Sequence, residues 1–217
     1  MARINSVDCT PMNEKPDIRP ETPGSLTSPK LGMWLFLVTE LLFFGGLFLL
    51  YSVYRSMYMQ AFHSAAMEEN IVLGTANTII LITSSLTMAL SIAAIRRGEK
   101  KMSSAFQVMT VLLGALFLVN KYFEWGAKIS HGIYPGSPLM LQTDKGEVLF
   151  YSLYYVMTGI HGLHVIIGIG VILAMLLFTR REKITSESFV KLENTGLYWH
   201  FVDIVWIYLF PLFYLIT

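Results

Sequence analysis

The sequence predicts an all-α integral membrane protein, a bundle of five transmembrane helices. Its 217 residues are 54% hydrophobic and only 14% charged, whereas a soluble domain carries about 25% charged residues. The apolar residues also fall into five stretches, and each is about as long as the roughly 20 residues that a helix needs to cross a bilayer. We expect the spans at residues 31–54, 71–95, 104–125, 148–178 and 196–216.

The segment before the first span, residues 1–30, is polar and contains five prolines. We therefore expect a loosely ordered tail rather than a cleavable signal peptide. The single cysteine, Cys9, lies in this tail and has no second cysteine with which to form a disulfide. The net charge of +1 predicts no bulk attraction to nucleic acid.

The first span contains one carboxyl group, that of Glu40. It lies about nine residues into the span, which places it roughly 13 Å deep at 1.5 Å per residue. A charged carboxylate at this depth costs about 2.5–3.5 kcal/mol unless it is protonated, paired or hydrated. Glu40 therefore predicts either a buried polar partner or a functional site.

The connection from residue 55 to residue 70 is expected to be short and polar, and it leads to a span rich in serine and threonine. Such small residues let helices approach closely. The third span ends in Lys121, Glu124 and Lys128, which share one helix face. We expect these three side chains to snorkel at the membrane interface. The fourth span exceeds one bilayer thickness, so we expect it to tilt or to project.

Two polar pairs interrupt the later spans. His161 and His164 lie in GIHGLHVIIG, and His200 and Asp203 in YWHFVDIV, each pair three residues apart on one helix face. A haem held by the histidine pair would need a ligand from another helix, so we favour hydrogen-bonded packing. Counting along the spans places Glu40, His200 and Asp203 in the inner half of the membrane and the histidine pair in the outer half. A proton-conducting or lipid-headgroup site and a purely structural contact between the first and last helices both remain open.

The positive residues predict the orientation. With the N-terminus inside, the inner segments hold most lysines and arginines, among them Arg96, Arg97, Arg180 and Arg181, whereas the outer connections hold only Arg55, Lys128 and Lys145. Positive residues favour the cytoplasmic side. We therefore expect a cytoplasmic N-terminus and a periplasmic C-terminus.

Four stretches of the chain resemble subunit III of the haem–copper terminal oxidases. They are GMWLFLVTELLFF, FEW, TGIHGLHVIIG and LYWHFVDIVWIYLF, spread over almost the whole chain after residue 30. The last two are long and specific. The chain resembles the five-helix bacterial form, whose N-terminus also faces inward. Asn120 and Lys121 differ from the residues that the family usually has before the carboxylate of FEW.

The resemblance implies a non-catalytic subunit of a proton-translocating cytochrome c oxidase in the bacterial plasma membrane. It implies no cofactor, metal ligand or catalytic residue in this chain, because haem and copper belong to the partner subunits. The chain would lie directly against subunit I, in a complex with subunit II, and bind phospholipid in a cleft. It would support proton uptake by subunit I and protect the active site during turnover.

The resemblance also assigns residues. Glu40 matches the carboxylate associated with carbodiimide reactivity in the family. Lipid binding or support of proton uptake is implied for Glu40, His200, Asp203, Trp34, Trp199, Glu193, Arg180 and Arg181. A structural polar role is implied for His161, His164 and Glu124.

Three other functions compete with this interpretation. A quinol oxidase subunit III differs only in the electron donor, which another subunit selects, and family frequency favours cytochrome c. A nitric-oxide-reductase-associated protein has the same fold but tends to carry Asp at the position of Glu40. A stand-alone proton-coupled transporter would use the intramembrane polar residues as a relay, but the chain has no internal repeat or paired broken helices of the kind many transporters show.

Overall fold

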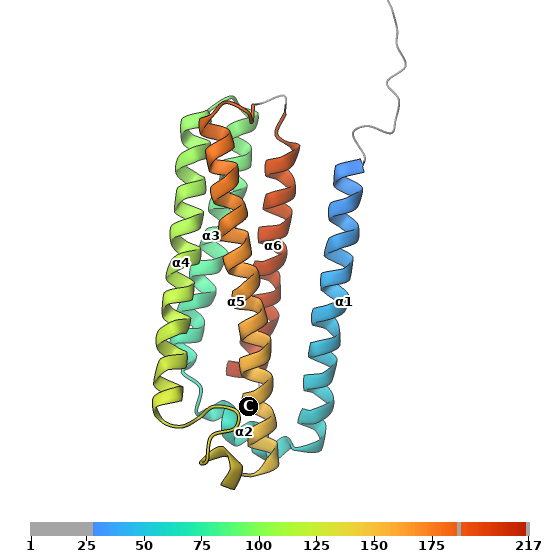
Figure 1. The fold of residues 1–217 in the computed structure, drawn as a ribbon, viewed down its shortest axis with the longest axis vertical. Coiled ribbons are helices and arrows are strands. Elements are labelled where there is room, and N and C mark those ends of the chain that lie inside the picture. Colours follow the sequence, from blue (N-terminus) through green and yellow to red (C-terminus); the bar gives the residue numbers. More distant parts are fainter. Residues whose placement is uncertain (1–27, 186–187, 216–217) are drawn as a thin grey trace, which may run out of the picture.

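The computed structural model describes residues 28–185 and 188–215, and Figure 1 shows their arrangement. The helices are α1 (Ser28–Met57), α2 (Met59–Met67), α3 (Ile71–Arg96), α4 (Lys100–Ser130), α5 (Lys145–Arg180) and α6 (Val190–Phe210). A 3₁₀ turn (Met140–Gln142) precedes α5, and a π-helical turn (Pro211–Leu215) continues α6. Within the described residues, five helices are long and apolar enough to span a membrane, all except α2. The prediction of an all-α bundle of five transmembrane helices is confirmed.

The connection between the first two spans is not the simple polar link that the sequence suggested. Residues 59–67 form α2, a helix of 9 residues that buries four side chains. Ala61 is one of them, and it lies so close to the start of α5 that a Cβ added at Gly146 would be 2.5 Å from its Cβ. Small residues on both helices permit this approach. Helix α2 therefore closes one end of the bundle.

Most spans extend beyond the residues predicted for them. Helix α1 begins at Ser28 and carries Pro29 in its first turn, where proline is tolerated because its missing N–H has no helical partner. The rest of the expected tail, residues 1–27 with Cys9, lies outside the described residues. Helix α6 begins six residues before its predicted start at residue 196, and residue 216 at the predicted end is not described.

Helices α3, α4, α5 and α6 form a closely packed four-helix body, and α1 lies to one side of it (Figure 1). The most apolar window of α1 is 6% buried, whereas those of the four body helices are 28–56% buried. Helix α1 contacts only α5, α6 and α2 in appreciable number. The body is thus the core of the protein, and α1 is an attached helix.

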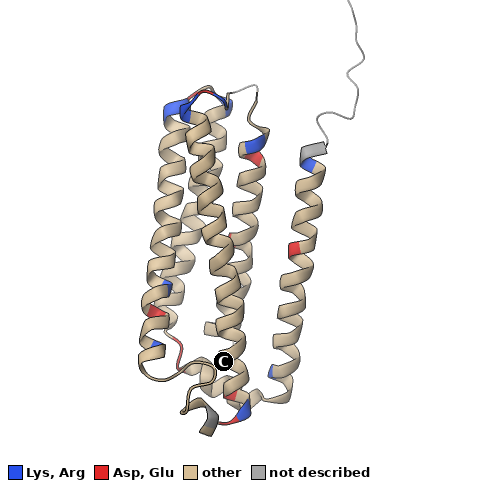
Figure 2. Cartoon of the chain, viewed as in Figure 1, with Lys and Arg blue, Asp and Glu red and all other residues tan. Residues whose placement is uncertain are grey.

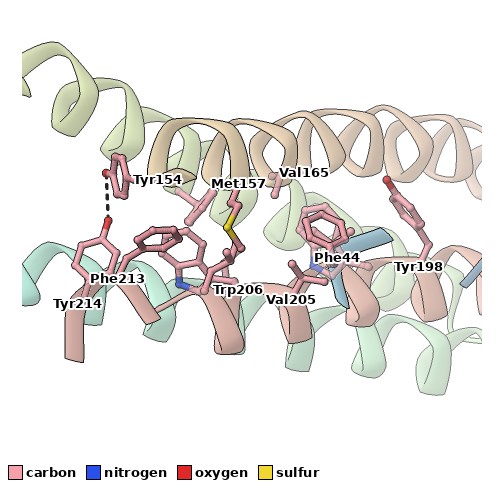
Figure 3. Packing of buried hydrophobic residues seen from close by; sticks show 14 of the residues in the cluster. Phe44, Tyr154, Met157, Val165, Tyr198, Val205, Trp206, Phe213 and Tyr214 are labelled. Carbon is pink, nitrogen blue, oxygen red and sulfur yellow. Dashed lines mark hydrogen bonds between the residues drawn. The ribbon is translucent and has the colours of Figure 1, made fainter. Parts of the chain in front are cut away.

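A tryptophan lies at the centre of the body. Trp199 of α6 is fully buried, and a Cβ added at Gly114 of α4 or Gly168 of α5 would lie 2.8 Å from its indole ring. Its Nε1–H donates to Ser84 Oγ of α3 at 3.0 Å. The indole therefore contacts all three neighbouring helices. Figure 3 shows a second buried tryptophan, Trp206, in the same aromatic core.

The two ends of the bundle differ in charge (Figure 2). We call the end where α3 and α5 finish and α4 and α6 begin the basic end. Its basic residues outnumber three glutamates, Glu99, Glu182 and Glu193, and are Arg96, Arg97, Lys100, Lys101, Arg180, Arg181, Lys183 and Lys191. The opposite end, which we call the α2 end, mixes both signs, with Glu68, Glu69, Lys128, Lys145 and Glu147. This asymmetry agrees with the lysine and arginine pattern used above, and the orientation across a membrane stays a prediction.

Candidate functional site

Glu40 of α1 is paired with a histidine of α5. Its Oε2 lies 3.1 Å from Nε2 of His164, and Nδ1 of the same ring lies 2.8 Å from the carbonyl oxygen of Ile160. Because a carbonyl can only accept, Nδ1 carries a hydrogen, and a neutral ring then has a bare Nε2. Nε2 can accept a hydrogen bond from a protonated Glu40 carboxyl. An imidazolium ring would instead donate from Nε2 to the Glu40 carboxylate, so the contact can form with the hydrogen on either side chain.

The partner of Glu40 differs from the sequence-based expectation. Glu40 was placed at the depth of His200 and Asp203, with His164 in the other half of the membrane. The first part agrees with the structure, because Leu41 and His200 line one groove, but the placement of His164 is wrong, since its ring contacts Glu40. Helix α5 has 36 residues, or about 54 Å at 1.5 Å per residue, well beyond the roughly 30 Å of a bilayer core. Counting from the ends of such a long helix misplaces its middle, where His164 meets Glu40.

The pair in α6 forms a separate polar site. Nδ1 of His200 lies 2.6 Å from Ser85 Oγ of α3. Asp203 is buried, and Ser85 is its neighbouring polar side chain. The hydrogen bond of His200 is thus made to α3 rather than to the first helix, although part of the His200 side chain also lines the groove beside α1.

His161 and His164 do not act as a pair, although they share a helix face in the sequence. His161 is fully buried between Phe117 and Trp206, with ring centroids 5.6 and 5.3 Å away. Among the described residues, no group of three His, Cys, Asp or Glu side chains lies close enough to hold a metal ion.

The lysines and glutamates near the end of α4 form a buried cluster, so the snorkelling interpretation is wrong. Lys121 and Glu124 are 7% and 6% exposed, and they pair at 3.2 Å. Lys121 Nζ donates to the hydroxyls of Tyr154 at 2.9 Å and Tyr214 at 3.1 Å, and both hydroxyls donate to Glu124 Oε1. Figure 3 shows the two tyrosines facing one another. The charges are buried because α5 and the end of α6 supply these hydrogen bonds.

A second ion pair extends this cluster toward the α2 end. Lys128 Nζ donates to Glu69 Oε1 at 2.7 Å, and the Glu69 side chain is fully buried. Glu69 lies between α2 and α3, outside the spans. Burial raises the pKa of its carboxyl above the ordinary value, and the positive charge of Lys128 opposes that rise.

At the basic end, Glu193 of α6 ties three helices together. Its carboxylate accepts from Arg96 of α3 and pairs with Lys30 of α1, Nζ to Oε2, at 3.0 Å. Arg96 is thereby engaged in the bundle, whereas Arg180 and Arg181 at the end of α5 are exposed. Arg180 and Arg181, for which the resemblance implies lipid binding, are therefore accessible, as is Arg97 at the end of α3.

The two tryptophans expected at a lipid cleft occupy opposite environments. Trp34 is 58% exposed and lines a groove of about 270 Å³ between α1 and α6. The groove is almost entirely apolar and is lined by Trp34, Leu37, Val38, Leu41, Leu197, His200, Phe201 and Ile204. Trp199 is fully buried in the body, which does not fit a place on the wall of a cleft.

Sequence reasoning missed the partners of these polar groups. Ser85, Tyr154 and Tyr214 complete the buried sites, but hydroxyl residues recur throughout the spans and none stands out by spacing. The one usable signal was charge balance. Lys121 and Lys128 match Glu124 and Glu69 in number, as a buried ionic cluster requires.

Comparison with known proteins places this chain in a family. The family model described as cytochrome c oxidase subunit III matches residues 22–217. The chain therefore belongs to the cytochrome c oxidase subunit III family. It is a subunit III of a haem–copper oxidase, and thus a multi-pass membrane protein that works in a complex with other subunits.

Individual relatives agree with this assignment. The chain is 35% identical to a cytochrome c oxidase subunit 3 of Thermostichus vulcanus over 86% of this chain and 87% of the relative. It is 37% identical to that of a Synechocystis species over 85% of this chain and 74% of the relative. It is also 32% identical to a probable quinol oxidase subunit 3 of Staphylococcus haemolyticus, over 86% and 88%. The similarity thus spans relatives named for two different electron donors.

Proposed function

We propose that this subunit III is a non-catalytic subunit of a proton-translocating cytochrome c oxidase of the bacterial plasma membrane. In this role it lies against subunit I, binds phospholipid beside α1 and supports the proton uptake of subunit I. The observation that carries the proposal is the Glu40–His164 pair. It is a polar contact that joins the most exposed spanning helix to the body.

The lipid part of the proposal rests on the groove between α1 and α6. Its walls are apolar, and it lies beside a helix whose side chains mostly face outward. An acyl chain fits such walls because lipid and aliphatic side chains are equally apolar. We infer that lipid in this groove completes the packing of α1.

The proton part rests on the chemistry of the pair. Glu40 and His164 contact one another at 3.1 Å and are partly accessible, with side chains 19% and 14% exposed. A polar partner lowers the cost of each polar group in apolar surroundings, so the contact holds α1 against the body. The pair therefore positions α1 rather than conducting protons, and its effect on subunit I is indirect.

Two substitutions of Glu40 test this function in the purified oxidase. Glu40→Gln keeps a donor for the bare Nε2 of His164, so subunit assembly, bound phospholipid and the initial rate of oxygen reduction should stay within about twofold of wild type, well under the factor of ten that 1.4 kcal/mol represents. Glu40→Leu removes the hydrogen bond, so the complex should assemble and start normally but lose phospholipid and then activity during sustained turnover. Thr39→Val, which changes an exposed neighbour, is the matched control.

The outcomes separate the parts of the proposal. Complete loss of oxidase activity in Glu40→Gln, with subunit I present and haem-loaded, contradicts a non-catalytic role for this residue. Wild-type behaviour of Glu40→Leu under sustained turnover contradicts the supporting role of the pair. Oxidation of a quinol, but not of reduced cytochrome c, by the wild-type complex would favour the second candidate, a quinol oxidase, since one relative carries that name.

A further inference from the structure

Helix α2 carries a stripe of sulfur and nitrogen ligands on its exposed face. Met59, His63 and Met67 follow one another, each four residues after the last, within this helix of 9 residues. Four residues advance the helix by one turn and about 40° more, so the three side chains lie along one face. Met59 and Met67 are each 66% exposed, and His63 is exposed as well. We call these three residues the α2 stripe.

The other face of α2 is fixed to the bundle. Its buried residues are Ala61, Phe62, Ala65 and Ala66. The Phe62 ring packs edge-on against Tyr51 of α1 and Phe150 of α5. Helix α2 is not one of the spanning helices, and it lies at the end of the bundle (Figure 1). The stripe therefore faces away from the packed contacts and lies outside the spans.

The stripe has no partner in the part of the chain that the structure describes. His63 forms no hydrogen bond or ion pair there, and both thioethers are mostly exposed. The carboxylates beside the stripe, by contrast, are engaged. Glu68 accepts a hydrogen bond from Tyr151, and Glu69 pairs with Lys128. The free ligand atoms on this face are thus two sulfurs and an imidazole, without a carboxylate.

These ligand types select a soft ion. Thioether sulfur suits Cu(I) and imidazole suits copper in general, whereas carboxylate and carbonyl oxygens suit Mg²⁺, Ca²⁺ and Mn²⁺. Zinc sites use thiolate, imidazole and carboxylate ligands, at least three from the protein. The stripe offers one ligand of those kinds, His63. Cu(I) is therefore the biological ion that matches the set.

Helical geometry lets one ion contact all three side chains. Side chains on a helix lean toward its N-terminus, so His63 lies over Met59 and Met67 lies over His63. Methionine is unbranched and has three rotatable bonds, which lets its sulfur adapt to a position set by another ligand. An ion held at the His63 ring is thus within one helical turn of a thioether on each side.

We propose that the α2 stripe binds one Cu(I) ion through the His63 imidazole and the thioethers of Met59 and Met67. The site holds the ion and carries out no oxidation or reduction. Under the orientation predicted above, it faces the periplasm. A metal site here departs from the family expectation that the chain has no metal ligand, and it stands apart from the role proposed for Glu40.

The test titrates the intact purified oxidase with Cu(I), buffered by bicinchoninate under ascorbate and without oxygen. A separate titration uses Ag(I), a soft ion distinct from any copper already in the complex. The wild type should take up one equivalent of either ion more than Met59→Leu/Met67→Leu, which keeps both side chains apolar and similar in size. The matched control Met102→Leu/Met109→Leu removes two thioethers of α4, each 50% exposed, and should keep the wild-type stoichiometry.

Variants of His63 and chemical labelling locate the ion. His63→Leu should lose the equivalent, whereas His63→Met supplies a third thioether and should retain Ag(I). An oxaziridine modifies exposed thioethers, so one equivalent of Ag(I) should protect Met59 and Met67 and leave Met102 labelled. Circular dichroism and subunit content establish that each variant complex has assembled.

Three results would overturn the proposal. The first is equal uptake of both ions by the wild type and by Met59→Leu/Met67→Leu. The second is a stripe that the oxaziridine does not label in the complex before metal is added, which would mean that a partner subunit covers it. The third is Zn²⁺ binding at the same concentration that needs His63 but neither methionine, which would mean a simple imidazole site.

Discussion

Helix α1 and helix α6 show opposite relations between hydropathy and burial. The best window of α1 has a hydropathy of 2.1 and is 6% buried, whereas that of α6 has a hydropathy of 1.3 and is 56% buried. In a soluble protein the more apolar helix would be expected inside. In a membrane the lipid is as apolar as a protein core, so hydropathy alone does not drive a helix inward.

The difference follows from where polar side chains find partners. Helix α6 carries Trp199, His200 and Trp206, which hydrogen-bond to Ser84, Ser85 and Thr78 of α3. Unpaired polar groups are costly in hydrocarbon, so these bonds keep α6 inside the body. Polarity, not apolar content, therefore marks the most buried span of this protein.

Helix α1 has a single carboxyl group in the middle of its span, and that group makes one of its polar contacts with the body. Lys30 and Tyr51 make others nearer its two ends. Glu40 reaches His164 of α5, while apolar side chains on several faces stay exposed, Leu35, Leu42 and Leu49 among them. A helix built in this way is suited to contact lipid or another subunit on its outer faces. In the body, by contrast, polar side chains of α6 pair with those of α3.

The strongest test of this comparison exchanges one tryptophan in each region for alanine. Trp199→Ala removes a fully buried side chain and should destabilise the subunit by about 3–5 kcal/mol, because the surrounding helices cannot close the cavity. Trp34→Ala removes a side chain that is 58% exposed and should change stability by no more than about 0.5 kcal/mol. Both can be measured as the thermal midpoint of protease protection of this chain within the detergent-solubilised complex. Similar losses in the two variants would show that α1 is as firmly packed as the body.

A smaller effect is expected from two glycines of α5. In Gly168→Ala the new Cβ would lie 2.8 Å from two atoms of the Trp199 ring, and this overpacking should cost about 1–3 kcal/mol. Gly170→Ala has no atom within 4 Å of the new Cβ and should stabilise the helix by about 0.5–1 kcal/mol. The same thermal assay checks both variants. Equal shifts of the same sign would argue against a tightly held Trp199.

The fold was largely predictable because each spanning helix must be apolar and long enough to cross the bilayer. Five apolar stretches gave five helices, and the polar residues within them marked the places where helices meet. Helix α2 was missed because 9 residues with three alanines resemble an ordinary polar connection. Its burial depends on close approach to Gly146, which no local pattern reveals.

The pairing of the polar residues was much less predictable. Spacing correctly grouped Lys121 with Glu124, because helical geometry is local. It did not reveal that Tyr154 and Tyr214 bury this pair, nor that Glu40 meets α5 rather than α6. Such contacts depend on the tilt and length of whole helices. Residue counting along one helix cannot supply them.

The smallest expected effect concerns pH and the α2 end of the body. Burial raises the pKa of Glu69 above its ordinary value of 4.5, so from about that pH upward the folded protein holds a proton that the unfolded chain has lost. Stability contributed by Glu69 is therefore full at lower pH and is lost as pH rises through the raised pKa. In the thermal assay, Glu69→Gln should show a weaker fall in stability with rising pH than the wild type.

A second variant sharpens this prediction. Lys128 lowers the pKa of Glu69 by its charge and its hydrogen bond, so Lys128→Met should raise that pKa further and carry the loss of stability to higher pH. Combining Lys128→Met with Glu69→Gln should remove the pH dependence that Lys128→Met adds, because the Glu69 carboxyl that titrates is then absent. If the double variant instead kept that dependence, another group of the buried cluster would be responsible.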